Sequence, residues 1–350
     1  WRYKTPLIFR ATPQWFMSMD KLNLRTSIIK GISKIKWLPS WGKDRIHNMI
    51  ENRPDWCLSR QRFWGVPIPL FLHKDTSELH PDTEKILAKA SNIIAEGNIE
   101  SWLDYDKSEI VSNIECYNEV KDTLDVWFDS GVTHETVLKS KGIKEKADLY
   151  LEGSDQHRGW FQSSLITSHA LSGDSPYKNV LTHGFVVDSD GQKMSKSLGN
   201  IVSPQAVIKD KGADILRLWV AMTDYSKEMN ISDEILNRVA ESYRRIRNTS
   251  KFLLANINGL DHENLIEDKE MVLLDKWIIF KAKKLDEQIR DDYENFKFHK
   301  ITQDIMNFCT LELGGYYLDI IKDRLYTSKK DGLARKSAQK ACYILIKYIN

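Results

Sequence analysis

Two lysines lie three residues apart in a short loop, and their spacing indicates phosphate chemistry. Lys193 and Lys196 are separated by Met194 and Ser195, and glycines at 191 and 199 flank the loop. Small flanking residues let a backbone approach its ligand, while two ammonium groups supply point charge to a polyphosphate. The alternative is an exposed basic turn, the usual state of surface lysines. Neither G-x-x-x-x-G-K-[ST] nor G-x-G-x-x-G occurs, so the common glycine loops for phosphate are not indicated.

The elements predicted around this loop are typical of an α/β protein. An apolar run at 149–151 predicts a buried strand, a polar loop follows it, and 160–171 predicts a helix that stops near Gly173. Further strands are expected at 179–181 and 185–187, with a tight turn at 188–191. Ser203 and Pro204 suit the start of the next helix. Open α/β sheets place ligands at strand ends, where the polar loops of this sequence fall.

The periodicity changes at Ser232, which suits a helix N-cap. Apolar residues then recur at three- and four-residue steps up to Gly259, predicting a long amphipathic helix. A second helix is expected over 274–296, and a third begins near 301. The last third of the chain therefore predicts an all-α helical bundle. Residues of about 70–122 are more polar and contain a helical pattern at 82–96, which indicates an insertion.

Composition excludes several classes of protein. The chain has 350 residues, enough for two or three domains, with 51 Lys and Arg against 49 Asp and Glu. Hydrophobic residues make up 41%, which excludes intrinsic disorder, and no apolar run approaches the length of a membrane span. The four cysteines are far apart in sequence, so we expect neither disulfides nor a zinc knuckle, and a cytoplasmic location.

Six blocks along the chain together resemble a known family. Residues 193–197 read KMSKS, the signature of class I aminoacyl-tRNA synthetases. The other blocks are similar to isoleucyl-tRNA synthetases: RATPQWF at 10–16, WCLSRQRFWG at 56–65, DVWFDSG at 125–131, EGSDQHRGWF at 152–161 and LTHGF at 181–185. Collinear blocks in matching strand, loop and helix contexts are more specific than one short motif.

The resemblance implies a domain division. Residues 1–231 would be the C-terminal half of a Rossmann-like catalytic domain with a parallel sheet, including the insertion at about 70–122 and the lysine loop at 193–197. Residues 232–350 would be a truncated helical anticodon-binding domain.

The resemblance also implies roles for individual residues. Lys193 and Lys196 would be catalytic, stabilising phosphate charge as pyrophosphate leaves, with Lys196 the more important of the two. The residues implied in binding ATP or the adenylate are Glu152, Gly153, Asp155, Gln156, His183, Gly184, Phe185, Val186, Met194 and Ser195. For Glu152 the alternative is a solvated acidic loop, and for His183 a satisfied core histidine.

Two tryptophans and a glutamine would form the amino-acid pocket: Trp127, Trp160 and Gln156. Without the resemblance, both indoles would be assigned to the core. Ser154, Asp155 and His157 contain the residue types of a hydrolytic triad, but they share one loop rather than converging from separate elements, which argues against that alternative.

A cationic side of the first long helix is a second implied interface. Arg244, Arg245 and Arg247 lie close together there. The ordinary interpretation is a solvated face, and the resemblance adds contact with tRNA phosphates without base specificity.

The activity implied is isoleucine–tRNA ligation: activation of L-isoleucine with ATP and Mg²⁺, then transfer to tRNA(Ile), by a cytoplasmic monomer that does not bind membranes. We expect no metal site in this chain and zinc only in a C-terminal module outside it. The family's His-x-Gly-His signature does not occur, and the editing core would lie upstream, so we expect a fragment that is inactive alone. Alternatives are a non-catalytic tRNA-binding module, a valyl or leucyl enzyme, and an unrelated nucleotide hydrolase.

Overall fold

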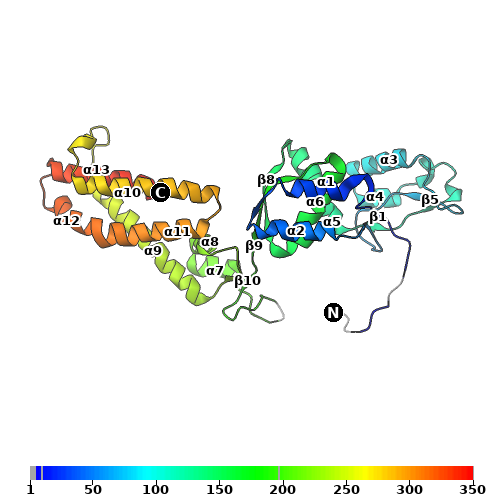
Figure 1. The fold of residues 1–350 in the computed structure, drawn as a ribbon, viewed down its shortest axis with the longest axis horizontal. Coiled ribbons are helices and arrows are strands. Elements are labelled where there is room, and N and C mark those ends of the chain that lie inside the picture. The colour runs from blue at the N-terminus through cyan, green and yellow to red at the C-terminus, as the bar shows by residue number, and fades with distance from the viewer. Residues whose placement is uncertain (1–4, 9–10, 196–197, 350) are drawn as a thin grey trace. The chain divides into compact units, whose positions relative to one another are not determined.

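The chain forms two compact units, Trp1–Thr182 and His183–Asn350 (Figure 1). The structure is a computed structural model that describes residues 5–8, 11–195 and 198–349. Each unit has its own buried apolar clusters, so each unit is described separately.

A three-stranded sheet lies at the centre of the first unit. Its order is β2 (Lys36–Leu38), β9 (Tyr177–His183) and β8 (Ala147–Gly153), and β2 runs parallel to β9 with Trp37 opposite Val180. The strands predicted at 149–151 and 179–181 are thus confirmed as parts of β8 and β9. The strand β2 was not predicted.

Three helices complete the core of the first unit. They are α1 (Leu24–Ile32), α2 (Trp41–Glu51) and α6 (Trp160–Ser172), and α1 contacts both of the others. Residues 161–169 of α6 are all buried, including Phe161 and Leu165. A helix buried on every side needs internal partners for its hydroxyl groups; the hydroxyl of Thr167 donates to the carbonyl of Gly131 at 2.8 Å. The helix predicted at 160–171 is α6.

Short antiparallel strand pairs come before helix α5 (Val126–Gly131) in the sequence. Strand β1 (Phe16–Met17) pairs with β3 (Trp56–Cys57), and β4 (Ser59–Arg60) pairs with β7 (Thr123–Leu124). Helix α5 follows β7 and packs on α6.

The segment predicted as an insertion has a core of its own. Strands β5 (Phe71–His73) and β6 (Tyr117–Glu119) pair antiparallel, and helices α3 (Thr83–Glu96) and α4 (Ile99–Asp104) lie between them in sequence. The cluster of buried apolar residues consists of Phe71, Ile86, Ala90, Trp102 and Val111. Helix α3 confirms the helical pattern at 82–96.

The second unit begins with the lysine loop and two short helices. Strand β10 (Val186–Val187) pairs parallel with β11 (Met229–Asn230), and α7 (Pro204–Lys211) and α8 (Ala213–Met222) lie between them in sequence. A small core joins these elements to the next helix, because Trp219 and Met229 pack in one cluster with Leu236. Because this small core includes the start of that helix, the boundary between the two compact units falls at 182/183. The predicted boundary between the catalytic and anticodon-binding domains, at 231/232, stays a prediction.

Within residues 198–349, the α-helices of the bundle are α9 (Asp233–Asn256), α10 (Leu273–Glu294), α11 (Phe298–Asn307), α12 (Leu318–Tyr326) and α13 (Leu333–Ile349). The hydroxyl of Ser232 accepts from the amide of Ile235 at 3.3 Å and caps α9 as predicted. A π-helix at Phe308–Tyr317 joins α11 to α12 without a break, which the sequence pattern did not indicate. The predicted class, an α/β fold with a parallel sheet followed by helices, is confirmed.

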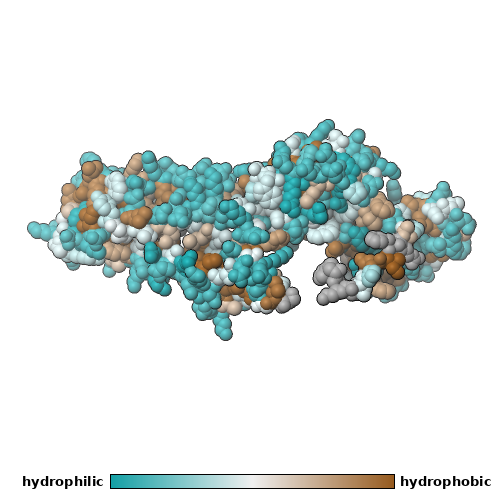
Figure 2. Space-filling model, turned by 60° about the horizontal axis from the view of Figure 1, so that its bottom comes forward, coloured by the Kyte–Doolittle hydropathy of each residue, from teal (hydrophilic) through white to brown (hydrophobic). Residues whose placement is uncertain are grey.

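The surface is mixed in polarity, as the balanced charge indicates. In Figure 2 hydrophilic residues cover most of the visible face, and apolar residues gather in small separate areas. Among the described helices, none combines the length and apolar character that spanning a membrane requires.

A buried carboxylate on α10 links this helix to the π-helix, α12 and α13. Asp275 on α10 accepts from the hydroxyl of Tyr317 at 2.7 Å and from both terminal nitrogens of Arg324, at 2.8 and 2.7 Å. The hydroxyl of Ser337 on α13 also donates to it. Burial, with the nearby Asp275 charge adding to it, raises the pKa of Tyr317 far above its usual value, so this phenol remains a donor.

Replacing this carboxylate should destabilise the bundle. Asp275→Ala leaves Arg324 as a largely buried, unpaired charge, which costs about 3–5 kcal/mol in the free energy of unfolding. Urea unfolding of the chain followed by far-ultraviolet circular dichroism measures it. The matched control is Asp319→Ala, which removes an exposed pair with Lys322 and should cost no more than about 1 kcal/mol. Equal effects of the two substitutions would contradict this assignment.

Candidate functional site

The end of β8 and the turn after it carry the carboxylates predicted to bind the adenylate. Glu152 is exposed, and its carboxylate accepts from the amide of Gly153 at 2.8 Å. A 3-10 turn at Ser154–Arg158 follows, and Asp155 is exposed on it. Both carboxylates therefore remain accessible for a ligand at the end of a strand.

Gln156 organises the start of α6. Its carbonyl oxygen accepts from the amide of Trp160 at 3.0 Å, and its amide nitrogen donates to Asp155 at 3.2 Å. A Cβ at Gly159 would lie 2.5 Å from the Gln156 oxygen and 2.8 Å from the ring of Trp127. Glycine at 159 therefore allows Gln156 and Trp127 to approach the same turn.

The two predicted pocket tryptophans differ in their surroundings. Trp160 is half-buried, stacks on Tyr150 with ring centroids 4.1 Å apart, and donates through Nε1 to the carbonyl of Ser130 at 2.9 Å. Trp127, at the first turn of α5, is 40% exposed. Trp160 is thus held by packing and a hydrogen bond, whereas Trp127 presents its ring to a cavity.

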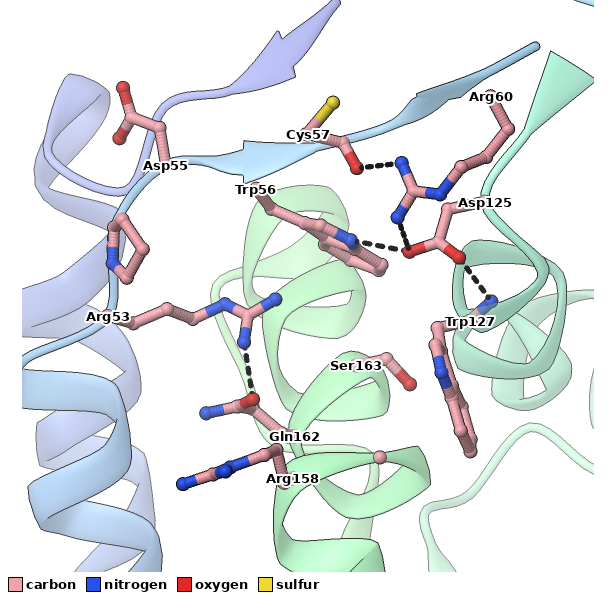
Figure 3. A pocket seen from close by; sticks show the side chains of 12 residues that line it. Arg53, Asp55, Trp56, Cys57, Arg60, Asp125, Trp127, Arg158, Gln162 and Ser163 are labelled. Carbon is pink, nitrogen blue, oxygen red and sulfur yellow. Dashed lines mark hydrogen bonds and ion pairs between the residues drawn. The ribbon is translucent and has the colours of Figure 1, made fainter. Parts of the chain in front are cut away.

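That cavity is drawn in Figure 3 and has a volume of ≈ 240 Å³. Its lining includes Trp127, Gly159 and three arginines, Arg53, Arg60 and Arg158. Trp160 and Gln156 are not among its lining residues. The structure therefore places Trp127 against a small cavity that Asp55 and Asp125 also line, so its charged groups are of both signs. Assignment of all three residues to one amino-acid pocket stays a prediction.

Asp125 fixes the position of α5 beside this cavity. It is buried and caps α5, accepting from the amide of Trp127 at 3.3 Å. The same carboxylate accepts from Nε1 of Trp56 at 2.9 Å and pairs with Arg60 at 2.9 Å (Figure 3). No role was predicted for Asp125, although it belongs to the DVWFDSG block.

Arg53 is a second residue that sequence analysis missed. Its guanidinium donates to the side-chain oxygen of Gln162 and lies over the ring of Trp56 at 5.5 Å (Figure 3). Its Nε is buried without a hydrogen-bond partner. Burial lowers the pKa of Arg53 below its usual value. No motif pointed to this residue; only its position just before the WCLSRQRFWG block could have done so.

His157 is a core residue, which removes the hydrolytic-triad alternative. Its side chain is fully buried against the rings of Trp41 and Phe161, and Nδ1 lies 3.1 Å from the carbonyl oxygen of Ser154. Burial lowers its pKa from 6.5 to about 4, so the ring is neutral at pH 7. Because Nε2 has no hydrogen-bond partner, it has no hydroxyl to activate.

The second unit carries the other predicted adenylate residues. Nδ1 of His183 lies 2.8 Å from the carbonyl oxygen of Gly184, and the amide of Gly184 donates to the carbonyl of Tyr225 at 2.9 Å. A Cβ at Gly184 would lie 2.0 Å from the carbonyl oxygen of Lys227. Gly184 is therefore required for close backbone packing, and its predicted contact with the adenylate stays a prediction.

The described part of the lysine loop is tied to the strand before it. Lys193 forms a β-bridge with Val187, and its ammonium lies 3.9 Å from the ring centroid of Phe185. Met194 and Val186 pack against the small core of the second unit. Lys196, predicted to be catalytic, and Ser197 lie outside the described residues.

The cationic side of α9 divides into two parts. Arg244 and Arg245 are exposed and both contact Glu241, at 2.7 and 3.6 Å. Arg247 lines a cavity of ≈ 870 Å³ together with Lys251. Arg247 therefore fits phosphate contact better than its two neighbours.

No metal site is evident in the described ranges, where no group of three or more His, Cys, Asp or Glu side chains could hold an ion. All four cysteines are free thiols. Burial raises the pKa of Cys309 to about 11 and that of Cys342 to about 12, which makes both unreactive near pH 7.

Comparison with solved structures defines the class of fold. The chain is similar to the Mycobacterium tuberculosis methionyl-tRNA synthetase in complex with methionyl-adenylate, with a TM-score of 0.66 and 16% sequence identity, over 96% of this chain and 59% of that one. The fold is therefore that of an aminoacyl-tRNA synthetase.

Family comparison assigns the chain more narrowly. Residues 2–232 match the family described as "tRNA synthetases class I (I, L, M and V)", and residues 275–350 match "Anticodon-binding domain of tRNA ligase". The chain belongs to the class I tRNA synthetases of this group.

Curated relatives named isoleucine–tRNA ligase share more than half of its residues. The protein of Vesicomyosocius okutanii is 57% identical over 98% of this chain, and that of Shewanella oneidensis is 56% identical over 98%. The chain spans only 36% and 37% of these relatives. The family resemblance seen in the sequence is confirmed.

The buried histidines should make the first unit sensitive to acid. His157 and His169 both have pKa values of about 4 in the folded state because of burial, against 6.5 when unfolded. Between these values the unfolded state binds more protons, so the free energy of unfolding should fall as pH drops from 6.5 towards 4. Urea unfolding followed by tryptophan fluorescence measures this, because nine of eleven tryptophans lie in residues 1–182.

His157→Gln should reduce the dependence of unfolding on pH, whatever its effect on stability at pH 7. Replacing His169 by Gln as well should reduce the dependence further, because burial also lowers the pKa of this ring to about 4. An unaltered slope in His157→Gln would show that this ring is not the titrating group.

Proposed function

We propose that the protein carrying this chain is an isoleucine–tRNA ligase. The observation that supports this proposal most is the identity of 55–57% with isoleucine–tRNA ligases over nearly the whole chain. In the proposed reaction the carboxylate of L-isoleucine attacks the α-phosphate of ATP, and pyrophosphate leaves. The resulting mixed anhydride then transfers its acyl group to a ribose hydroxyl of tRNA(Ile), releasing AMP.

The contribution of this chain to the first step is positioning and charge stabilisation. Lys193 and Lys196 stabilise negative charge on the phosphates that become pyrophosphate. The exposed carboxylates of Glu152 and Asp155 hold the ammonium group or ribose hydroxyls of the adenylate. Trp127 contacts the aliphatic side chain of isoleucine, supported by its exposed ring beside a small cavity.

Mg²⁺ fits this scheme as a partner of ATP rather than of the protein. The described residues offer no three-ligand carboxylate group, and Mg²⁺ commonly binds through substrate phosphates while keeping several waters. It would reduce the charge of the triphosphate. We further infer that the protein is a monomer and that it works in the cytoplasm, where free thiols such as these four persist.

The helical unit is proposed to contact tRNA. Arg247 and Lys251 line one cavity on α9 and provide two cations for phosphate groups. Such contacts would position the RNA without reading its sequence.

Removing a lysine of the loop should slow activation of isoleucine. In the full-length protein, Lys193→Ala and Lys196→Ala should each lower kcat of isoleucine-dependent ATP–pyrophosphate exchange by about 10²–10³-fold, the usual cost of losing one preorganised donor. The control Lys209→Ala removes an exposed lysine on α7 and should leave exchange unchanged. Exchange with valine or leucine but not isoleucine would reassign the substrate, and no exchange at all would favour a non-catalytic module.

Trp127→Ala should weaken amino-acid binding selectively. Loss of an aromatic contact of about 1.5–3 kcal/mol corresponds to a KM for isoleucine raised by roughly 10–100-fold, with KM for ATP unchanged. Trp41→Ala removes an indole of similar exposure, 39% against 40%, from outside the cavity and should leave KM for isoleucine as it was. A parallel rise of KM for ATP in Trp127→Ala would argue against the pocket assignment.

A further inference from the structure

The turn that leads into the lysine loop is organised by one carboxylate. Oδ1 of Asp188 accepts from the amides of Asp190 and Gln192, at 3.0 and 2.8 Å. The amide of Asp188 donates to the carbonyl of Gln192 at 3.0 Å, and Gly191 has a φ of +74°, which favours glycine. These contacts account for the shape of the turn itself.

The second oxygen of Asp188 is used differently. Oδ2 accepts from the side-chain amide of Asn200 at 2.8 Å, and Oδ1 of Asn200 accepts from the backbone amide of Ser195 at 2.9 Å. A hydrogen-bond relay therefore runs from residue 188 through 200 to 195. We call these two side chains, Asp188 and Asn200, the loop latch.

The latch lies next to the lysine predicted to stabilise phosphate charge. Ser195 is two residues from Lys193, which is itself bridged to Val187, the neighbour of Asp188. Hydrogen bonds from Asn200 and from the turn amides lower the pKa of Asp188, so its carboxylate is charged near pH 7. Both ends of the loop are thus held together by a charge-assisted contact on the surface.

We propose that Asp188 and Asn200 are positioning residues that fix the lysine loop for activation of the amino acid. This inference rests on the proposed function, because the loop is held in place for that reaction. The latch itself contacts no substrate. The Oδ1 contacts are sufficient to form the turn. The hydrogen bonds through Asn200 to Ser195 are not needed for the turn, and they stabilise the loop that follows it. Misplacement of a charge-stabilising group by about 1 Å can cost about 10²-fold in rate.

The relay can be broken and rebuilt by exchanging its two residues. In D188N the side-chain NH2 introduced at position 188 faces the side-chain NH2 of Asn200, so two donors oppose each other. If the Asn200 side chain flips so that its oxygen accepts from position 188, its NH2 then opposes the backbone N–H of Ser195. In N200D two carboxylates oppose each other. In the double variant D188N/N200D, the amide introduced at position 188 donates to the carboxylate introduced at position 200. The other oxygen of that carboxylate accepts from the amide of Ser195, so the pattern and the net charge are restored.

In the full-length protein, each single variant should lower kcat of ATP–pyrophosphate exchange by about 10–100-fold, with KM for isoleucine and the melting temperature unchanged. The double variant should recover to within about threefold of the wild type. The control is D190N, which makes the same charge change in an exposed turn residue outside the relay. Rates in D188N equal to those in D190N, or a double variant no better than either single one, would overturn the proposal.

A second measurement separates this inference from the proposed function. Hydrogen exchange of the Ser195 amide in the full-length protein should be slow in the wild type and in the double variant, and at least about tenfold faster in D188N. Equal exchange rates in all forms would overturn the latch directly. If the full-length wild type shows no isoleucine-dependent activity while Ser195 is protected as expected, the proposed function fails and the latch stands as a structural feature.

Discussion

The close approach of two backbone segments in the second unit determines where the lysine loop begins. Gly184 packs against the carbonyl of Lys227 at a distance that leaves no space for a side chain. The hydrogen bonds that follow, from Met229 to Phe185 at 2.8 Å and from Ile231 to Val187 at 3.0 Å, hold this strand to the segment before α9. The loop therefore starts from a strand that packs, through the small core, with residues of α7, α8 and α9.

This anchoring explains how a surface loop can hold charge in a defined place. Lys193 rests over the ring of Phe185, and Asp188 and Asn200 close the loop at its base. In the first unit, exposed side chains are held in place by other contacts. Buried Asp125 caps α5, which carries Trp127, and Gln156 caps the start of α6. The exposed carboxylates of Glu152 and Asp155 lie at the end of β8 and on the turn that leads into α6. Side chains supported in this way keep their geometry without being buried themselves.

Local patterns in the sequence predicted what local forces determine. Helix α9 was predicted from its Ser232 cap and its periodicity, and α6 from an apolar run that ends near Gly173. Pairing between distant segments could not be predicted: β10 meets β11 more than forty residues later, and β2 joins the sheet beside β9. The contacts of Asp125, Arg53 and Asn200 could not be predicted for the same reason, because each depends on a partner that only the fold brings near.

The central claim is that the loop around Lys193 contacts the phosphates of ATP. Amine-reactive labelling of the full-length protein, read residue by residue with mass spectrometry, tests it most directly. Saturating ATP with Mg²⁺ should protect Lys193 from modification, while Lys209, exposed on α7, should react at the same rate with and without nucleotide. Equal labelling of Lys193 in the presence and absence of ATP would contradict the account.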